Sequence, residues 1–352
     1  MNDIKISLLL TVSLLLIIAH SVSGQMKTEK FEFKYNGNML IGFLDLPEGR
    51  DPSGIVILVP GYGKTNFGEH NWYYDSLRSN ITQIGFACCE WDKTGCGKSE
   101  GDFDFSQPVQ SSAKEVLAAI EELIHRNISG SNKIGLWGIS RAGWICPLVI
   151  GEYPSIAFWI SVSGTDDKEN FGYLLESNFR IEGRSEAQTQ LLISEWHKGN
   201  DIFRKGGSFE EYQMATQILR KDTLWLSVSG EQYTKEGYLR NQKQFINEHH
   251  EFDEETGLMI YVPNFRETLK KINCPVLAIF GEKDANVDWR KTMVLYRETI
   301  GNNKNVSLAI KTLPDCNHSI IKCKTGGIHE KMNNWEYGDK YLEIIRTWLR
   351  GR

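Results

Sequence analysis

A serine, an aspartate and a histidine that lie far apart in the sequence could together perform nucleophilic catalysis. Ser140 stands in Gly138-Ile139-Ser140-Arg141-Ala142, with small residues two positions before and two positions after the serine. A serine hydroxyl is a weak nucleophile at neutral pH, so it needs a base to remove its proton and an acid to orient that base. His318 and Asp284 are the candidates for these two roles. The three residues predict acyl transfer through a covalent serine intermediate.

The serine lies where the pattern predicts a sharp turn between a strand and a helix. Residues 133–139 form a short apolar run, and Trp144, Ile145, Leu148 and Val149 then recur at helical spacing. A strained turn of this kind holds the hydroxyl at the edge of the sheet, and bulky neighbours would collide with the adjoining strand and helix. The same short pattern also occurs by chance in glycine-rich proteins, so it needs support from the rest of the chain.

The acid and the base each follow a predicted strand. Residues 274–281 form an apolar run that leads to Asp284, and residues 306–313 lead into a loop that carries His318. Glu282 is the second candidate for the acid. The chain order serine, aspartate, histidine and the strand-end position of all three predict one catalytic triad. A histidine on an ordinary surface loop is the alternative.

A second group of residues could stabilise the negative oxygen that forms during acyl transfer. Residues 54–59 form a continuous apolar run, typical of a strand buried on both faces, which ends at Pro60-Gly61-Tyr62-Gly63. We expect the backbone N–H groups of Tyr62 and Arg141 to form the oxyanion hole. Both residues are also candidates for substrate binding, and the Arg141 guanidinium could instead pair with an acidic residue of the insertion described below. A plain glycine turn after a strand is the alternative for this loop.

Strands and helices alternate along the first half of the chain, which predicts an α/β fold with a mostly parallel, doubly wound sheet. A hairpin is expected around Asn36-Gly37. The other expected elements are a strand at 85–91 and helices at 72–84 and 110–126. The glycine-rich segment 95–99 lacks the four residues between glycines that a phosphate-binding Walker loop requires, so no nucleotide site is predicted.

The order of these motifs resembles the α/β-hydrolase superfamily, and within it the bacterial secreted esterases and the serine-aminopeptidase-like (S33-type) hydrolases. The resemblance rests on the segments 60–63, 92–101 and 138–143. Segment 92–101 is similar to the Asp-x-Arg-Gly-x-Gly-x-Ser-x-Gly signature of that group, with Thr94 where arginine is usual. The resemblance implies an α/β-hydrolase fold, the triad named above, no cofactor, and a small-molecule ester or peptide as substrate.

A long insertion over residues 165–272 divides the expected core into residues 25–164 and 273–352. Its charged, mostly helical pattern with clustered aromatic residues predicts a helical cap or lid over the active site. Residues 248–255 are rich in histidine, aspartate and glutamate, but adjacent histidines point to different faces of a helix, so no metal site is predicted.

Residues 1–24 have the character of a secretory signal peptide. Lys5 precedes an apolar run that ends near Ala19, small residues follow, and cleavage after Gly24 is expected. The run of about 14 residues is shorter than the roughly 20 that a spanning helix needs, so a secreted or periplasmic protein without a stable membrane span is predicted. The net charge of −5 gives no electrostatic footprint for nucleic acid. Among seven cysteines, Cys316 and Cys323 form the one disulfide expected.

Three functions fit these observations: an esterase, a peptidase or amidase with the same triad, and a non-catalytic binding protein on the hydrolase fold. Few residues separate the expected cleavage site from the first core strand, which leaves no room for the propeller domain of prolyl-oligopeptidase-like enzymes. This favours esters. The triad favours an enzyme, although a fold alone would not.

Overall fold

The computed structural model describes residues 26–168, 171–229, 234–247, 251–253, 259–332 and 334–352. The expected signal peptide lies outside these residues, as does most of the acidic segment 248–255. None of the helices in the described residues is both long and apolar enough to cross a membrane.

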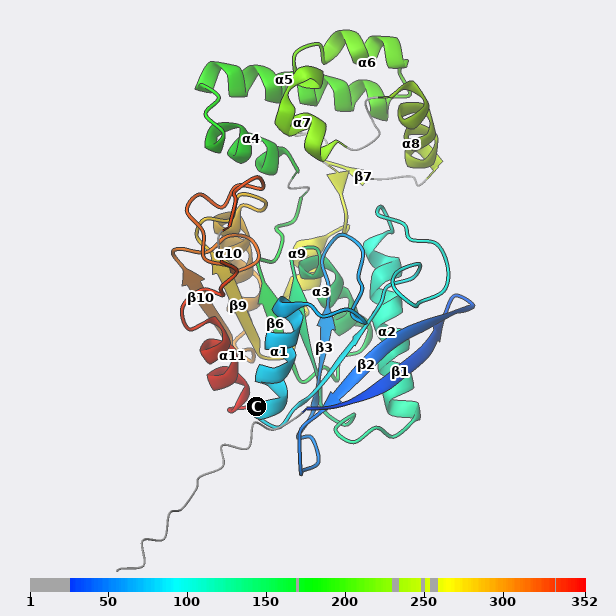
Figure 1. Cartoon of the computed structure of the whole chain (residues 1–352), viewed down its shortest axis with the longest axis vertical. Helices are drawn as coiled ribbons and strands as arrows, with labels where there is room; N and C mark the ends of the chain where they lie inside the picture. Colours follow the sequence, from blue (N-terminus) through cyan, green and yellow to red (C-terminus); the bar gives the residue numbers. More distant parts are fainter. Residues whose placement is uncertain (1–25, 169–170, 230–233, 248–250, 254–258, 333) are drawn as a thin grey trace, which may run out of the picture.

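An eight-stranded sheet runs through the molecule in the order β1-β2-β4-β3-β5-β6-β9-β10 (Figure 1). The hairpin of β1 (Lys27–Tyr35) and β2 (Asn38–Leu46) is antiparallel, and β2 also pairs antiparallel with β4 (Ala87–Trp91). All remaining pairs are parallel. They involve β4 and the strands β3 (Ile55–Val59), β5 (Ile134–Ile139), β6 (Phe158–Val162), β9 (Val276–Gly281) and β10 (Leu308–Leu313). The predicted mostly parallel α/β sheet is confirmed.

Side chains of β3 alternate between two hydrophobic cores, one on each face of the sheet. Ile55, Ile57 and Val59 belong to one core, and Val56 and Leu58 belong to the other. This explains why the strand is apolar at every position. Two sets of helices cover these cores: α2 (Val109–His125), α3 (Ala142–Glu152) and α10 (Trp289–Glu298) on the first, and α1 (Trp72–Gln83) and α11 (Tyr341–Leu349) on the second.

The insertion forms a separate helical layer at one end of the molecule (Figure 1). Its helices, which we call the inserted helices, are α4 (Phe171–Ile181), α5 (Glu186–Arg204), α6 (Phe209–Ala215), α7 (Thr223–Val228) and α8 (Lys235–Asn247). They have a hydrophobic core of their own, which includes Phe179, Trp196 and Trp225. Helices α5 and α6 each begin with a capping box, on Ser185 and Ser208.

The chain returns to the main body through a short ribbon of β7 (Glu251–Phe252) and β8 (Met259–Ile260). Helix α9 (Phe265–Lys270) follows and packs on α3. Phe265 and Leu269 are part of the first hydrophobic core. The segment from Val262 to Ile272, which the sequence analysis assigns to the insertion, therefore packs with the sheet domain.

The predicted disulfide between Cys316 and Cys323 is wrong, because both thiols are free. The two segments run antiparallel, with Cys316 opposite Lys322 and the Cys323 N–H donating to the Asp315 carbonyl at 2.9 Å. Since side chains alternate between faces along paired segments, the two cysteines face opposite sides. The Cys316 sulfur instead packs against Gly338, where a Cβ would overlap it.

Candidate active site

Ser140 lies in a strained turn between the end of β5 and the start of α3. Its φ of +57° is in the left-handed region that residues other than glycine rarely adopt. Its N–H donates to the Val162 carbonyl of β6 at 2.9 Å. A Cβ on Gly138 would lie 2.8 Å from the Ala142 Cβ and 2.7 Å from the Cys146 sulfur. The small residues on either side of the serine are therefore required by the close contact of strand and helix.

Asp284 and His318 are in direct contact. The His318 Nδ1 and the Asp284 Oδ2 are 2.7 Å apart. The other carboxylate oxygen, Oδ1, accepts the backbone N–H groups of Asn286 at 2.8 Å and Val287 at 2.9 Å. The Asp284 side chain is fully buried, whereas that of His318 is 14% exposed. This arrangement fixes the imidazole through Nδ1 and leaves Nε2 available for proton transfer.

Strand pairing brings the two halves of the candidate site to one edge of the sheet. The Ser163 N–H, just after β6, donates to the Ile279 carbonyl of β9 at 2.8 Å. The Lys283 N–H, just after β9, donates to the Cys316 carbonyl in the loop after β10 at 2.9 Å. The ends of β5, β6, β9 and β10, which carry the three predicted catalytic residues, therefore lie in sequence along this edge.

Within the described residues, no hydrogen bond joins Ser140 to His318. Catalytic hydrogen bonds between a nucleophile and its base are often long until substrate binds. Glu282, the second candidate for the acid, forms no hydrogen bond or ion pair with His318 among these residues, and its backbone carbonyl accepts the indole N–H of Trp289 at 3.2 Å. The structure thus pairs the histidine with Asp284 and not with Glu282.

The loop after β3, residues 60–67, lies directly against the serine, and we call it the oxyanion loop after its predicted role. A Cβ on Gly61 would be 3.2 Å from the Ser140 Cβ and 3.7 Å from its Oγ. The peptide between Gly61 and Tyr62 is therefore next to the nucleophile, and Arg141 follows the nucleophile in the chain. These are the positions that the two predicted oxyanion donors require.

The Arg141 side chain is buried, and among the described residues it forms no ion pair with an acidic residue of the insertion. Its Nη1 donates to the Ser112 Oγ at 2.9 Å, its Nη2 donates to the Gln107 carbonyl, and its guanidinium lies over the Tyr62 ring at 5.2 Å. Burial lowers the pKa of Arg141. The side chain thus supports the loop that carries Tyr62, because its hydrogen-bond partners lie in α2 and in the loop before it.

A small cleft opens beside this loop. Tyr62 stacks on Phe105 with ring centroids 5.3 Å apart, and the two residues are 42% and 62% exposed. Arg141 and Lys93 also line the cleft. It combines exposed aromatic surface with two cations next to the candidate nucleophile.

The inserted helices hold the loop that carries the acid. The Tyr173 hydroxyl of α4 donates to the Asp284 carbonyl at 3.1 Å. Asn178, which is fully buried, donates through Nδ2 to the Ala285 carbonyl at 3.1 Å and accepts the Ile328 N–H at 2.8 Å. The sequence analysis missed both residues. No local pattern could have found them, because each contact joins residues more than 100 positions apart.

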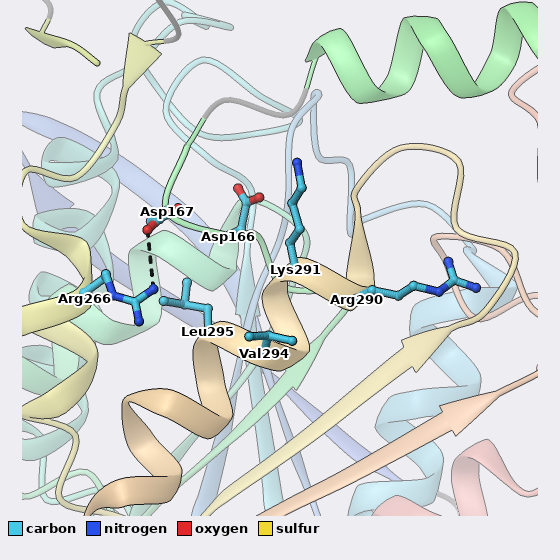
Figure 2. Close-up of a pocket in the computed structure, with 7 residues that line it drawn as sticks. All are labelled: Asp166, Asp167, Arg266, Arg290, Lys291, Val294 and Leu295. Atoms are coloured by element: carbon cyan, nitrogen blue, oxygen red, sulfur yellow. Dashed lines mark ion pairs between the residues drawn. The ribbon is translucent and has the colours of Figure 1, made fainter. Parts of the chain in front are cut away.

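A second hollow lies where the chain leaves β6 for the insertion (Figure 2). Arg266 points toward Asp167, with charged atoms 3.8 Å apart (Figure 2). Arg266 also pairs with Glu298 at 2.6 Å. The lining of this hollow includes none of the predicted catalytic residues. Among the residues that the structure describes, no group of three or more histidine, cysteine, aspartate or glutamate side chains could hold a metal ion.

Known hydrolases resemble this chain in one sequence segment and in fold. Residues 50–168 match the family model described as serine aminopeptidase, S33. A solved esterase from Pyrococcus furiosus is 16% identical, with a TM-score of 0.52 over 93% of this chain and 89% of the esterase. Est1E from Butyrivibrio proteoclasticus with ferulic acid bound is also 16% identical, with a TM-score of 0.50 over 91% of this chain and 96% of that protein. No curated protein sequence matches the chain.

The chain has the α/β-hydrolase fold, as the motifs predict. Its segment 50–168, which holds the oxyanion loop and the candidate nucleophile, resembles the S33 serine aminopeptidases. The family match and the fold together support a hydrolase of the serine type.

Proposed function

We propose that the protein is a secreted serine hydrolase that cleaves carboxylic esters through an acyl-enzyme intermediate. The observation that carries the proposal is the 2.7 Å contact between His318 and a fully buried Asp284, at the edge of the sheet where Ser140 occupies a left-handed turn. A histidine on an ordinary surface loop would not be expected to contact a buried carboxylate at this edge of the sheet.

Each residue has one role in the proposed reaction. His318 Nε2 removes the proton from the Ser140 hydroxyl as its oxygen attacks the ester carbonyl, and then gives that proton to the leaving alcohol. Asp284 holds the imidazole in the required tautomer and stabilises the imidazolium. The backbone N–H groups of Tyr62 and Arg141 donate to the negative oxygen. Water, activated by the same histidine, then hydrolyses the acyl-enzyme and frees the serine.

The cleft favours a substrate with an apolar or aromatic portion. Tyr62 and Phe105 expose much of their stacked rings beside the oxyanion loop. Burying such surface against an aryl or acyl group is favourable by about 25 cal/mol per Å². The inserted helices would cover this portion, which is the lid role that the sequence predicts for them.

A serine peptidase is the second candidate, because residues 50–168 match a serine aminopeptidase model. The same three side chains would serve either reaction, so the substrate decides between the two. A panel of p-nitrophenyl esters and aminoacyl-anilides with purified protein separates them. We expect turnover of the esters at kcat/KM at least about tenfold above the anilides, and Ser140→Ala to lower kcat by on the order of 10³ or more. Anilide turnover above ester turnover would favour the peptidase, and full activity of Ser140→Ala would refute both.

Secretion is a separate part of the proposal. Cleavage after Gly24 would leave a mature chain that begins at Gln25. N-terminal sequencing of protein recovered from the medium or periplasm tests this, and an intact Met1 on exported protein would contradict it.

A further inference from the structure

The glycine-rich segment 92–101 lacks the residue spacing of a phosphate-binding loop. It instead forms hydrogen bonds with the oxyanion loop. Asp92 accepts the Phe67 N–H on Oδ1 at 2.8 Å, and the Lys93 N–H donates to the Thr65 Oγ1 at 2.8 Å. The segment wraps closely around this contact, since a Cβ on Gly97 would overlap the Asp92 carboxylate. The segment thus holds the far end of the loop that begins at Gly61.

The Lys93 side chain reaches the near end of the same loop. Its Nζ donates to the Gly61 carbonyl at 3.0 Å and lies 5.8 Å from the centroid of the Phe103 ring. No carboxylate lies within ion-pair distance of this ammonium among the described residues. Withdrawing a lysine from water costs free energy, and here the strongest fixed acceptor that it reaches is a backbone carbonyl. A hydrogen bond from a charged donor is about twice as strong as a neutral one.

The contact with this carbonyl matters because the carbonyl belongs to the peptide that carries the predicted oxyanion donor. The Gly61 carbonyl and the Tyr62 N–H belong to the same peptide group, which is planar, so in the trans form the two point in opposite directions. A donor that holds the oxygen therefore also fixes the direction of the N–H. The charge polarises the peptide as well, which strengthens its N–H as a donor.

We propose that Lys93 is a positioning residue, which orients and polarises the Gly61–Tyr62 peptide so that its N–H faces the oxygen of the reacting carbonyl. The proposal rests on the proposed serine hydrolase activity. It assigns Lys93 no contact with substrate. It also explains why this lysine lines the cleft with a neutral carbonyl as its hydrogen-bond partner among the described residues. A misdirected donor would weaken the transition state more than substrate binding, so Lys93 acts on kcat.

The protonation of Lys93 provides a signature that a purely structural role would lack. Burial, and to a lesser degree the nearby Arg141 guanidinium, lower the pKa of Lys93 to about 8. A neutral amine is a weaker donor than an ammonium. The activity of the wild-type protein should therefore decline as pH rises through about 8. In Lys93→Arg this decline should disappear, because a guanidinium stays protonated over this range.

The test compares Lys93→Met with Lys98→Met on a p-nitrophenyl ester. Lys98 is an exposed residue of the same segment 92–101, and its side chain makes no hydrogen bond or ion pair among the described residues. The control variant thus removes the same charge from the same segment without touching Gly61. We expect kcat to fall about 10- to 100-fold in Lys93→Met with KM within about twofold, and both to stay unchanged in Lys98→Met. Lys93→Arg should retain at least about a third of the wild-type kcat.

Equal kcat values for Lys93→Met and Lys98→Met would overturn the inference, as would an alkaline decline that persists in Lys93→Arg. Thermal melting checks that the variants are folded. If Lys93→Met does not fold, the pH profile of Lys93→Arg decides alone. Absence of ester and anilide turnover in the wild-type protein would instead refute the proposed function, so the two failures are distinguishable.

Discussion

Replacing Asn178 with leucine should loosen the loop that carries the acid. The side chain is fully buried and donates to the Ala285 carbonyl, and it accepts the Ile328 N–H. Leucine has a similar volume but no polar atoms, so both backbone groups would lose their partner. An unsatisfied buried group costs about 1–3 kcal/mol, and Ile328 is only half-buried, so we expect a loss of about 2–4 kcal/mol in the free energy of unfolding.

The loss should also appear in catalysis, because Ala285 directly follows Asp284. A shift of about 1 Å in a catalytic group can cost on the order of 10² in rate, so we expect kcat to fall by about 10-fold or more. Urea denaturation measures the stability, and ester hydrolysis below the unfolding transition measures kcat.

Asn273→Leu is the matched control. Asn273 also donates to a distant backbone carbonyl, that of Pro154 at 3.1 Å, but it does so at the surface. Water can replace that bond, so its loss should cost less than about 1 kcal/mol and leave kcat unchanged. If Asn178→Leu were as stable and as active as this control, the conclusion that the inserted helices hold the acid loop would be refuted.

Three further changes have defined outcomes. Asp284→Asn should lower kcat by on the order of 10³ or more with little change in KM, because the amide favours the wrong imidazole tautomer; steady-state kinetics with near-normal kcat would contradict this. Gly326→Ala should lower the melting temperature, since the residue has φ of +79° and an added Cβ would overlap the Lys283 carbonyl, and an unchanged Tm would contradict the packing. Burial raises the pKa of Glu90 from 4.5 to about 8 against the opposing effect of Arg78, so the folded state binds the extra proton. Stability should therefore decline as pH rises from about 4.5 to 8. The Tm measured across this range should fall in the wild-type protein and should not show that fall in Glu90→Gln. Parallel Tm–pH profiles of the two proteins would contradict the reasoning.

The parts of the structure that local chemistry determines could be predicted from the sequence. Asn36 and Gly37 both have positive φ, 47° and 82°, which is the turn that an Asn-Gly pair between two strands predicts. The apolar run of β3 is buried on both faces of the sheet, as expected. In both cases the residue types that carry the signal lie within a few positions of each other in the sequence.

The parts that depend on distant contacts could not be predicted. The Arg141 side chain turned out to be held by Ser112 and the Gln107 carbonyl, and no nearby pattern distinguishes these partners from an acidic residue of the insertion. The cysteine spacing at 316 and 323 allows a bridge, but the pairing register turns the two thiols to opposite faces. Lys93 carries a usable signal, since it follows a buried strand beside the oxyanion loop, but its partner is known only from the folded chain.

The central claim is that the Ser140 hydroxyl is an activated nucleophile. Intact-protein and peptide mass spectrometry after reaction with a fluorophosphonate tests this most directly. We expect one adduct per chain on the peptide that contains Ser140, and slow or absent labelling of His318→Ala. A wild-type protein that stays unmodified, or that carries the adduct on another residue, would contradict the account.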